Sequence, residues 1–157
     1  MIIDLILKKE YIRLKDKLNV NYFVFKNNIM NFADRVAAIE SDKNPLAKNS
    51  TSSAKGMYQY IDSAVIPALT RLARYDIHLL HKNMLDYSTE EQTAIFLADI
   101  FQKTGTDKYL IAIANDDDMK NQGMLYAKFH HTNPDAATLQ RMNKFFAINK
   151  NWQDVYS

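Results

Sequence analysis

The chain of 157 residues contains no cysteine, only three glycines and only three prolines. Without cysteine it can form neither a disulfide framework nor thiolate metal ligands, although this leaves the compartment open. So few glycines and prolines leave little room for a turn-rich all-β architecture. Core material is plentiful, with nine Tyr, eight Phe and seven Met. We therefore expect a mainly α-helical fold in a single domain, since the length suits one core better than two.

The sequence also lacks a large charge of either sign and any long hydrophobic run. A formal net charge of +2 gives no basic stripe for nucleic acid, so we expect no nucleic-acid partner. No stretch approaches the roughly 20 apolar residues that span a bilayer, so we expect no membrane span. Residues 1–9 are interrupted by Asp4 and end in two lysines, unlike the continuous apolar core of a secretory signal.

The first 29 residues are Lys-rich and then aromatic, and no glycine or proline marks a linker after them. Asn31 is a plausible N-cap for a helix whose apolar residues recur at helical spacing. These apolar residues are Phe32, Val36 and Ile39. We predict that residues 1–29 form an N-terminal extension, packed on or docking a domain that covers residues 30–157.

Further helices are indicated along the rest of the chain. One is expected over residues 63–74, and Ser88 to Glu91 fits a capping box before the next. Three aspartates at residues 116–118 predict a turn or a helix start, and a helix that follows should end near residues 130–131. Asn133 followed by Pro134 then predicts the start of a last helix.

The most informative stretch is residues 38–61, in which several short motifs follow one another. In order they are Glu40-Ser41, Asn44-Pro45-x-Ala47, Ser53-Ala54-x-Gly56 and Gln59. In this order and spacing they resemble the lysozyme-like soluble lytic transglycosylase family, whose members cut the glycan strands of bacterial peptidoglycan. Each match is weak alone, and the specificity comes from their common register. The resemblance implies a lysozyme-like fold with Glu40 as the catalytic acid.

The resemblance also implies that the residues after the acid line a sugar groove opposite Glu40. The motif residues with an implied role in substrate binding are Ser41, Ser53, Gly56, Met57, Tyr58 and Gln59. Glycine would permit close approach of the backbone to the saccharide, and the Gln59 amide offers both donors and acceptors. Ser41 would help to orient the Glu40 region. The sequence has Met57-Tyr58 where Leu-Met is commoner, so we expect Tyr58 to lie partly in the groove.

The chemistry of Glu40 can also be argued from its neighbours. Cleaving a glycosidic bond needs a carboxylic acid that keeps its proton near neutral pH, and packing against apolar side chains raises a carboxyl pKa. Glu40 follows Val36 by one helical turn and adjoins Ile39, near a helix end set by Asn44 and Pro45. We therefore expect a raised pKa for Glu40. The alternative is an ordinary solvated glutamate at the end of a helix.

Beyond residue 61 the resemblance becomes weaker. The Ala-Tyr-Asn-x-Gly element of the family has only a loose counterpart at residues 113–117, where Ala114 replaces the tyrosine and Asn115 is the implied substrate-binding residue. The run from Leu125 to Ala137 is similar to a tyrosine-and-histidine segment of phage-encoded and virion-associated relatives. This resemblance implies a phage origin and places Tyr126 near Glu40 as a residue that binds substrate or positions the acid, whereas a core tyrosine is the alternative.

Neither a metal nor another cofactor is expected. His130 and His131 are adjacent, which differs from a helical His-x-x-x-His pair, and no cysteine accompanies them. The aspartates at residues 116–118 lack the alternating ligands, central glycine and closing glutamate of an EF-hand. A solvated acidic turn is the simpler reading of that run.

The reaction type depends on a second carboxylate. Glycosidases ordinarily pair two carboxyl groups, whereas lytic transglycosylases of this family use one glutamate, first as acid and then as base toward the C6 hydroxyl of the sugar. Asp62 and residues 116–118 are candidates for a hydrolytic partner, but none accompanies the matched motif. We favour transglycosylation between MurNAc and GlcNAc, with formation of 1,6-anhydro-MurNAc ends.

Several alternatives stay open at this point. They are a muramidase that uses water, a chitinase-like enzyme, and a catalytically degenerate virion structural module, which the change at Ala114 motivates. We expect peptidoglycan glycan strands as the substrate and other phage virion proteins as possible partners. Both a soluble endolysin and a virion component fit. The site of action would be the bacterial cell wall in the periplasm, with the protein in the host cytoplasm before release or in the virion.

Overall fold

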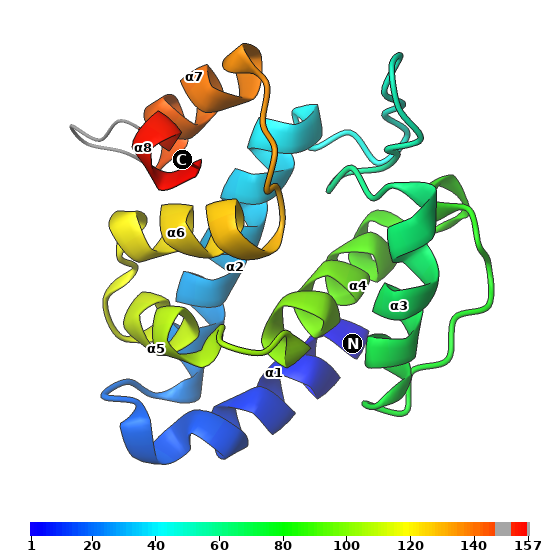
Figure 1. Ribbon diagram of the computed structural model, residues 1–157. Coiled ribbons are helices and arrows are strands. Elements are labelled where there is room, and N and C mark those ends of the chain that lie inside the picture. Colours follow the sequence, from blue (N-terminus) through cyan, green and yellow to red (C-terminus); the bar gives the residue numbers. More distant parts are fainter. Residues whose placement is uncertain (147–151, 157) are drawn as a thin grey trace.

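The computed structural model describes residues 1–146 and 152–156, and its regular structure is almost wholly helical (Figure 1). The helices in chain order are α1 (Ile2–Leu14), α2 (Tyr22–Ser41), α3 (Asp62–Ala73), α4 (Thr89–Gln102), α5 (Asp107–Asp116), α6 (Met119–Phe129), α7 (Ala136–Phe145) and α8 (Trp152–Tyr156). Short 3-10 turns are η1 (Lys15–Lys17) and η2 (Met84–Asp86). Isolated β-bridges join Lys55 to Lys48 and to Tyr60, and the described residues contain no longer strand. The expected mainly α-helical single domain is confirmed.

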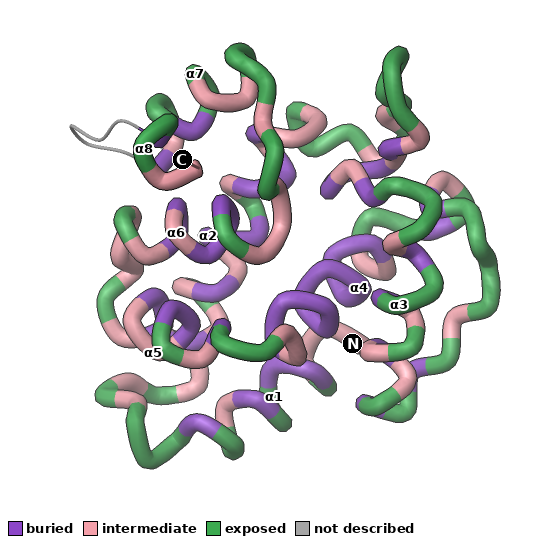
Figure 2. The backbone as a smooth tube through the Cα atoms, viewed as in Figure 1, coloured by how far each residue is buried: buried purple, intermediate pink, exposed green. Residues whose placement is uncertain are grey.

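Helix α4 lies at the centre of the fold, as its almost continuous burial in Figure 2 shows. Residues 92–101 are all buried, and α1 and α3 both pack against this helix. A helix that is covered on every side needs apolar residues all round rather than on one stripe, and α4 has them. Its start is fixed by the predicted capping box, in which Ser88 and Glu91 exchange side-chain and backbone hydrogen bonds.

Helix α2 begins earlier than predicted. Its N-cap is Asn21, whose side chain accepts a hydrogen bond from the Val24 amide, so the predicted start at Asn31 is wrong. The buried stripe already begins at Phe25 and continues through the predicted boundary between residues 29 and 30. Ile6 and Leu7 of α1 are fully buried in the same core, so residues 1–29 are part of the domain. The predicted C-terminal limit, residue 157, lies outside the described residues.

The last turn of α2 carries Glu40 and ends just after it. Asp42 takes the left-handed conformation at the C-cap, with φ 53°, and its amide bonds back to the helix. The Ser41 hydroxyl donates to the carbonyl of Met57 at 2.8 Å, which ties this helix end to the loop that leads to α3. The helix end expected before Pro45 is thus confirmed.

The segment that faces this helix end connects α6 to α7. Helix α6 starts at its N-cap Asp118, in line with the turn or helix start predicted there, and its last residue is Phe129. Helix α7 has Asp135 as its N-cap, whose side chain accepts from the Thr138 amide at 2.8 Å. The predicted cap at Asn133 is therefore wrong, because the carboxylate two residues later takes that role. Among the described helices, none combines the length and the apolar character needed to cross a membrane.

Candidate active site

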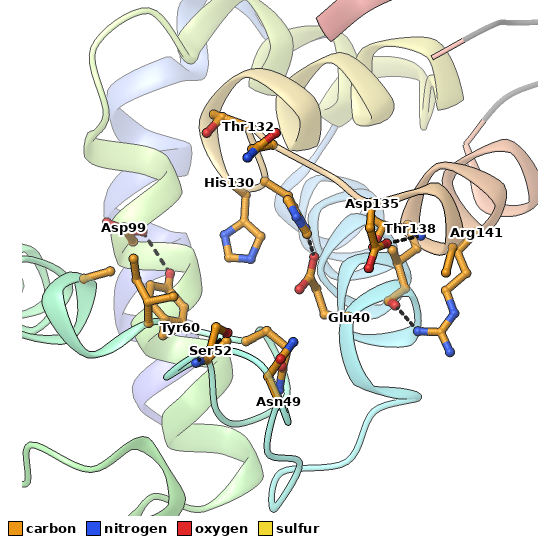
Figure 3. A pocket seen from close by; sticks show the side chains of 18 of the residues that line it. Glu40, Asn49, Ser52, Tyr60, Asp99, His130, Thr132, Asp135, Thr138 and Arg141 are labelled. Atoms are coloured by element: carbon orange, nitrogen blue, oxygen red, sulfur yellow. Dashed lines mark hydrogen bonds and ion pairs between the residues drawn. The ribbon is translucent and has the colours of Figure 1, made fainter. Parts of the chain in front are cut away.

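An open cleft of about 750 Å³ lies where the end of α2 meets the loop before α3 and the segment between α6 and α7. Figure 3 shows the Glu40 side chain entering it from the end of α2, with Asn49 and Ser52 on the facing loop. Asp99 of α4 and Arg141 of α7 also line it, and in this view Glu40 lies between them. The acid predicted from the sequence is therefore in the wall of a cleft wide enough for a ligand.

Glu40 is held asymmetrically. Its side chain is only 6% exposed, and its Oε1 accepts hydrogen bonds from the Tyr126 hydroxyl and, at 2.8 Å, from His131 Nδ1. Its Oε2 accepts no hydrogen bond from any residue that the structure describes. One carboxyl oxygen is thus fixed by two donors, and the other is left for whatever enters the cleft.

Tyr126 and His131 reach Glu40 because of how α6 ends. Tyr126 is fully buried on α6, and the amide of His131 donates to the Tyr126 carbonyl at 3.0 Å, which closes the helix with both side chains on the same side. The Tyr126 hydroxyl lies 3.2 Å from His131 Nδ1, so the three polar groups are in mutual contact. Tyr126 lies near Glu40 as predicted, but it is fully buried and outside the cleft wall, so the predicted contact with substrate is wrong and its role is to position the acid.

The His130 side chain makes different contacts from the side chain of His131. Its Nε2 donates to the Tyr58 carbonyl at 2.8 Å, and its ring packs edge-on against Phe96 and Tyr60. Burial lowers the pKa of His130, in keeping with a neutral imidazole that donates one hydrogen bond. His130 therefore joins the segment after α6 to the loop before α3, across the back of the cleft.

The pKa of Glu40 does not follow the expectation from its apolar neighbours. Burial raises it, but the hydrogen bond from His131, the charge of that imidazole and the Tyr126 hydroxyl lower it by more, so that it falls below the ordinary 4.5. The pKa of His131 is lowered by burial and raised by more through Glu40, so it lies above 6.5. The predicted rise for Glu40 is wrong because the argument included Val36 and Ile39 but not these distant donors. At intermediate pH the two groups form an ion pair.

Replacing His131 by glutamine is expected to destabilise the protein most between about pH 4.5 and pH 6.5. The lowered pKa of Glu40 gives stability that is complete above 4.5 and is lost as pH falls through its folded value. The raised pKa of His131 gives stability that is complete below 6.5 and is lost as pH rises through its folded value. Chemical denaturation of wild type and His131→Gln across pH 3 to pH 9 measures the difference.

The matched control is His78→Gln, because His78 is 64% exposed and its contact with the exposed Asp76 is long, at 3.8 Å. It should shift the free energy of unfolding little at any pH. A destabilisation by His131→Gln that is the same at every pH would contradict the ion pair with Glu40.

Of the motif residues around the acid, Gln59 lies in the cleft wall as predicted, whereas the substrate contact predicted for Ser41 is wrong. Gln59 lines the cleft, with φ 53° and its side-chain amide donating to the Gly56 carbonyl at 3.0 Å. Ser41 is outside the cleft wall, but its hydrogen bond to Met57 fixes the helix end beside Glu40. This is the orienting role that the motif implied for Ser41.

Three neighbours of Gln59 are turned into the core instead of the groove. Tyr58 is 1% exposed, stacks on Phe96 with 4.3 Å between ring centroids, and bonds Thr93 through its hydroxyl. The amide of Met57 donates to Gln92 Oε1 at 2.8 Å, and Gly56 lies against the same side chain. The predictions that Gly56, Met57 and Tyr58 line the groove are wrong, because α4 offers an apolar ring and a buried amide that hold this turn.

Ser53 and Asn115 are also outside the cleft. The Ser53 hydroxyl accepts from the Asp62 amide at 2.9 Å and so holds the start of α3. Asn115 accepts from the Asn19 amide at 2.7 Å and donates to the Lys17 carbonyl, which joins α5 to the loop after α1. Both predicted substrate contacts are therefore wrong, and each side chain is committed to a loop.

The acidic residues suggested as hydrolytic partners do not reach the cleft. Asp62 is 72% exposed and pairs with Lys55, and Asp117 pairs with Arg35. Neither they nor the neighbouring aspartates at residues 116 and 118 line the site.

Two other carboxylates do line the cleft, and both have partners. Asp99 bonds the Tyr60 hydroxyl and pairs with Arg71 and Lys103. Asp135 caps α7. Asp135 uses Oδ1 for this cap and is exposed, so Glu40 is the cleft carboxyl that combines near-complete burial with an oxygen that accepts no hydrogen bond from a described residue. Among the described residues, no group of three or more Asp, Glu or His side chains is arranged to hold a metal ion.

Sequence reasoning missed His131 as the partner of Glu40, and it missed Arg141 as a cation of the cleft. The signal for His131 was its position directly after the predicted end of α6, beside Tyr126. Comparison of the chain with protein-family models, curated proteins and solved structures finds no match. The function must therefore be inferred from the cleft itself.

Proposed function

We propose that this protein cleaves the glycan strands of peptidoglycan between MurNAc and GlcNAc, with Glu40 as the catalytic acid. The supporting observation is a nearly buried carboxyl in the wall of an open cleft, with Oε1 held by Tyr126 and His131 and Oε2 without a hydrogen bond from any described residue. A group that must pass a proton to a ligand needs one fixed and one accessible oxygen. The motif order across residues 38–61 supports the same assignment.

The Glu40–His131 pair can supply a protonated Glu40 without taking up a further proton. Ionised Glu40 beside protonated His131 carries as many protons as neutral Glu40 beside neutral His131. A sugar that fills the cleft removes water, which disfavours the two separated charges and favours the neutral form. In that form His131 has lost its Nε2 proton through water and keeps the Nδ1 proton that bonds Oε1, and Glu40 carries the gained proton on Oε2. Oε2 donates this proton to the glycosidic oxygen as the bond to the anomeric carbon breaks.

Tyr126 and His131 also stabilise the state that follows proton transfer. The carboxylate left on Glu40 is stabilised by the Tyr126 and His131 hydrogen bonds to Oε1. It then accepts the proton of the C6 hydroxyl as that oxygen attacks the anomeric carbon, which forms a 1,6-anhydro end and restores neutral Glu40. Asp99 is neutralised by Arg71 and Lys103, and Asp135 caps α7 through Oδ1, which favours transglycosylation over hydrolysis by a second carboxylate.

The biological setting follows from the same proposal. The segment with Tyr126 and His131 resembles phage-encoded relatives, which favours a phage lysin that acts on the bacterial cell wall, as an endolysin or as part of the virion.

Mass spectrometry of the products tests the reaction. Purified peptidoglycan digested with the protein should yield muropeptides with 1,6-anhydro-MurNAc ends. Reducing MurNAc ends would instead establish a muramidase, with water as the attacking group. Release of no soluble fragments would overturn the enzymatic proposal and favour a structural module of the virion.

Tyr126→Phe is expected to lower the cleavage rate about tenfold while the protein stays folded, because one of two donors to the product carboxylate is lost. The phenyl ring keeps its packing against Phe146. Initial rates of peptidoglycan clearing measure the effect.

Tyr109→Phe is the matched control, since Tyr109 is buried at 7% exposure and lies outside the cleft. Equal rates for Tyr126→Phe and Tyr109→Phe would contradict the role given to the Tyr126 hydroxyl.

A further inference from the structure

The cations that line the cleft differ in how far their charge is already neutralised. Lys103 donates to the Phe129 carbonyl and pairs with Asp99 at 3.2 Å. His131 is paired with the catalytic carboxyl. Arg141 of α7 has no comparable partner in the described part of the chain.

The guanidinium of Arg141 is anchored but not neutralised. Its Nη1 donates to the Ile39 carbonyl at 2.7 Å, which fixes it one residue away from Glu40 along α2. Its Nη2 is 3.9 Å from Asp42, whose side chain is 83% exposed, so this ion pair is long and screened by water. Arg141 itself is 46% exposed. Its other N–H donors are therefore available to a ligand beside the acid.

The surroundings of Arg141 place it along the path of a polymer. Asn49 and Ser52 stand on the facing loop, and Thr138 lies one turn before Arg141 on α7 (Figure 3). Asp135, the other charged residue of this wall, uses its carboxylate to cap the helix. A chain of sugars that passes Glu40 between these walls would bring its substituents to the Arg141 fork.

A guanidinium fork matches the geometry of a carboxylate and binds it with two parallel hydrogen bonds. In peptidoglycan the MurNAc residues carry a lactyl group, which is either a free carboxylate or linked to a peptide that has carboxylates of its own. Chitin has the same glycosidic linkage and acetamido groups without any carboxylate. An anchored arginine beside the acid therefore distinguishes these two classes of glycan.

We propose that Arg141 is a specificity-determining residue that binds a carboxylate carried by the MurNAc side of the strand, on the lactyl group or on its peptide. This inference rests on the proposed function and adds to it the substituent that is recognised.

Binding can be measured apart from cleavage in a Glu40→Gln background, which leaves the ligand uncut. Three soluble ligands are titrated by calorimetry: chitin oligomers, glycan oligomers stripped of peptide with free lactyl carboxylates, and peptide-bearing glycan oligomers. Adding Arg141→Gln should lower the affinity for the two carboxylate-bearing ligands about tenfold and change the affinity for chitin oligomers less than about twofold. Adding Arg141→Lys should give a smaller loss, since it keeps the charge without the fork.

The pattern of losses identifies the group that is bound. Weakening of both carboxylate ligands assigns the lactyl group, and weakening of the peptide-bearing ligand alone assigns the peptide. Equal weakening of all three ligands, or of none, would overturn the inference. Arg74→Gln is the matched control, because Arg74 is an exposed arginine outside the cleft that bonds Gln102. Thermal unfolding of each variant reports whether loss of the Ile39 anchor disturbs the fold.

The proposed function is judged by a separate measurement, the cleavage of peptidoglycan by the wild-type protein. Cleavage without discrimination by Arg141 would overturn this inference alone. Discrimination in binding without cleavage by the wild type would overturn the enzymatic proposal alone, and no binding of any ligand would overturn both.

Discussion

Glu40→Gln is expected to lower the rate of peptidoglycan cleavage by about 100-fold to 10,000-fold, the usual contribution of a general acid. The amide has nearly the same shape as the carboxyl but cannot give up a proton to the glycosidic oxygen. It can still accept from Tyr126 and His131 through its carbonyl oxygen, so the cleft should keep its form. Turbidity loss of purified peptidoglycan, with muropeptide release as a second readout, measures the rate.

The matched control is Glu90→Gln, because Glu90 is a partly buried glutamate of α4 that lies outside the cleft. It should cleave at nearly the wild-type rate. A Glu40→Gln protein as active as the Glu90→Gln protein would remove Glu40 from the chemistry. Thermal unfolding separates a catalytic loss from a folding defect, and Glu40→Gln should unfold at somewhat lower temperature near pH 6 because the ion pair with His131 is gone.

The helical architecture could be predicted largely from local patterns. The capping box at Ser88 and the end of α6 near His130 were both predicted, since caps and periodicity are encoded within a few neighbouring residues. The start of α2 was missed because Asn31 and Asn21 are equally good caps by type. The burial of Phe25 and Ile29 against other helices decides between them, and that is not a local property.

The candidate site was only partly predictable for the same reason. Glu40 and Gln59 could be found because their motif is contiguous, whereas the direction of each side chain depends on what α4 presents to the loop. Phe96 and Gln92 draw Tyr58 and the adjacent turn into the core.

The pKa of Glu40 is the clearest example of a property that local sequence could not predict. Apolar neighbours along α2 predicted a raised pKa, but the donor that reverses the direction, His131, comes from a segment 91 positions away. A sequence pattern along one helix cannot reveal this hydrogen bond, because the bond arises where the segment after α6 meets the end of α2.

Gly56→Ala is expected to destabilise the fold by about 2–5 kcal/mol, the second large effect that the structure predicts. Gly56 has φ +86°, a conformation that costs an alanine about 1–2 kcal/mol. A Cβ at this position would also lie 2.5 Å from Gln92 Oε1 and 2.8 Å from Met84 Cγ, so packing must shift at an additional cost of about 1–3 kcal/mol. Glycine is thus required here for the approach of α4, not of a saccharide.

Gly105→Ala separates the cost of backbone strain from the cost of the steric overlap of the added Cβ. Gly105 has φ +91°, so the backbone strain is similar, but the nearest atom to its Cβ would be Phe129 Cζ at an ordinary 3.6 Å. Denaturant titration should therefore show a loss for Gly56→Ala that exceeds the loss for Gly105→Ala, and equal losses would contradict the close approach of Gln92. Because Gln92 also holds the Met57 amide, next to the Tyr58 carbonyl that His130 binds, Gly56→Ala should lower cleavage as well, whereas Gly105→Ala should leave it nearly unchanged.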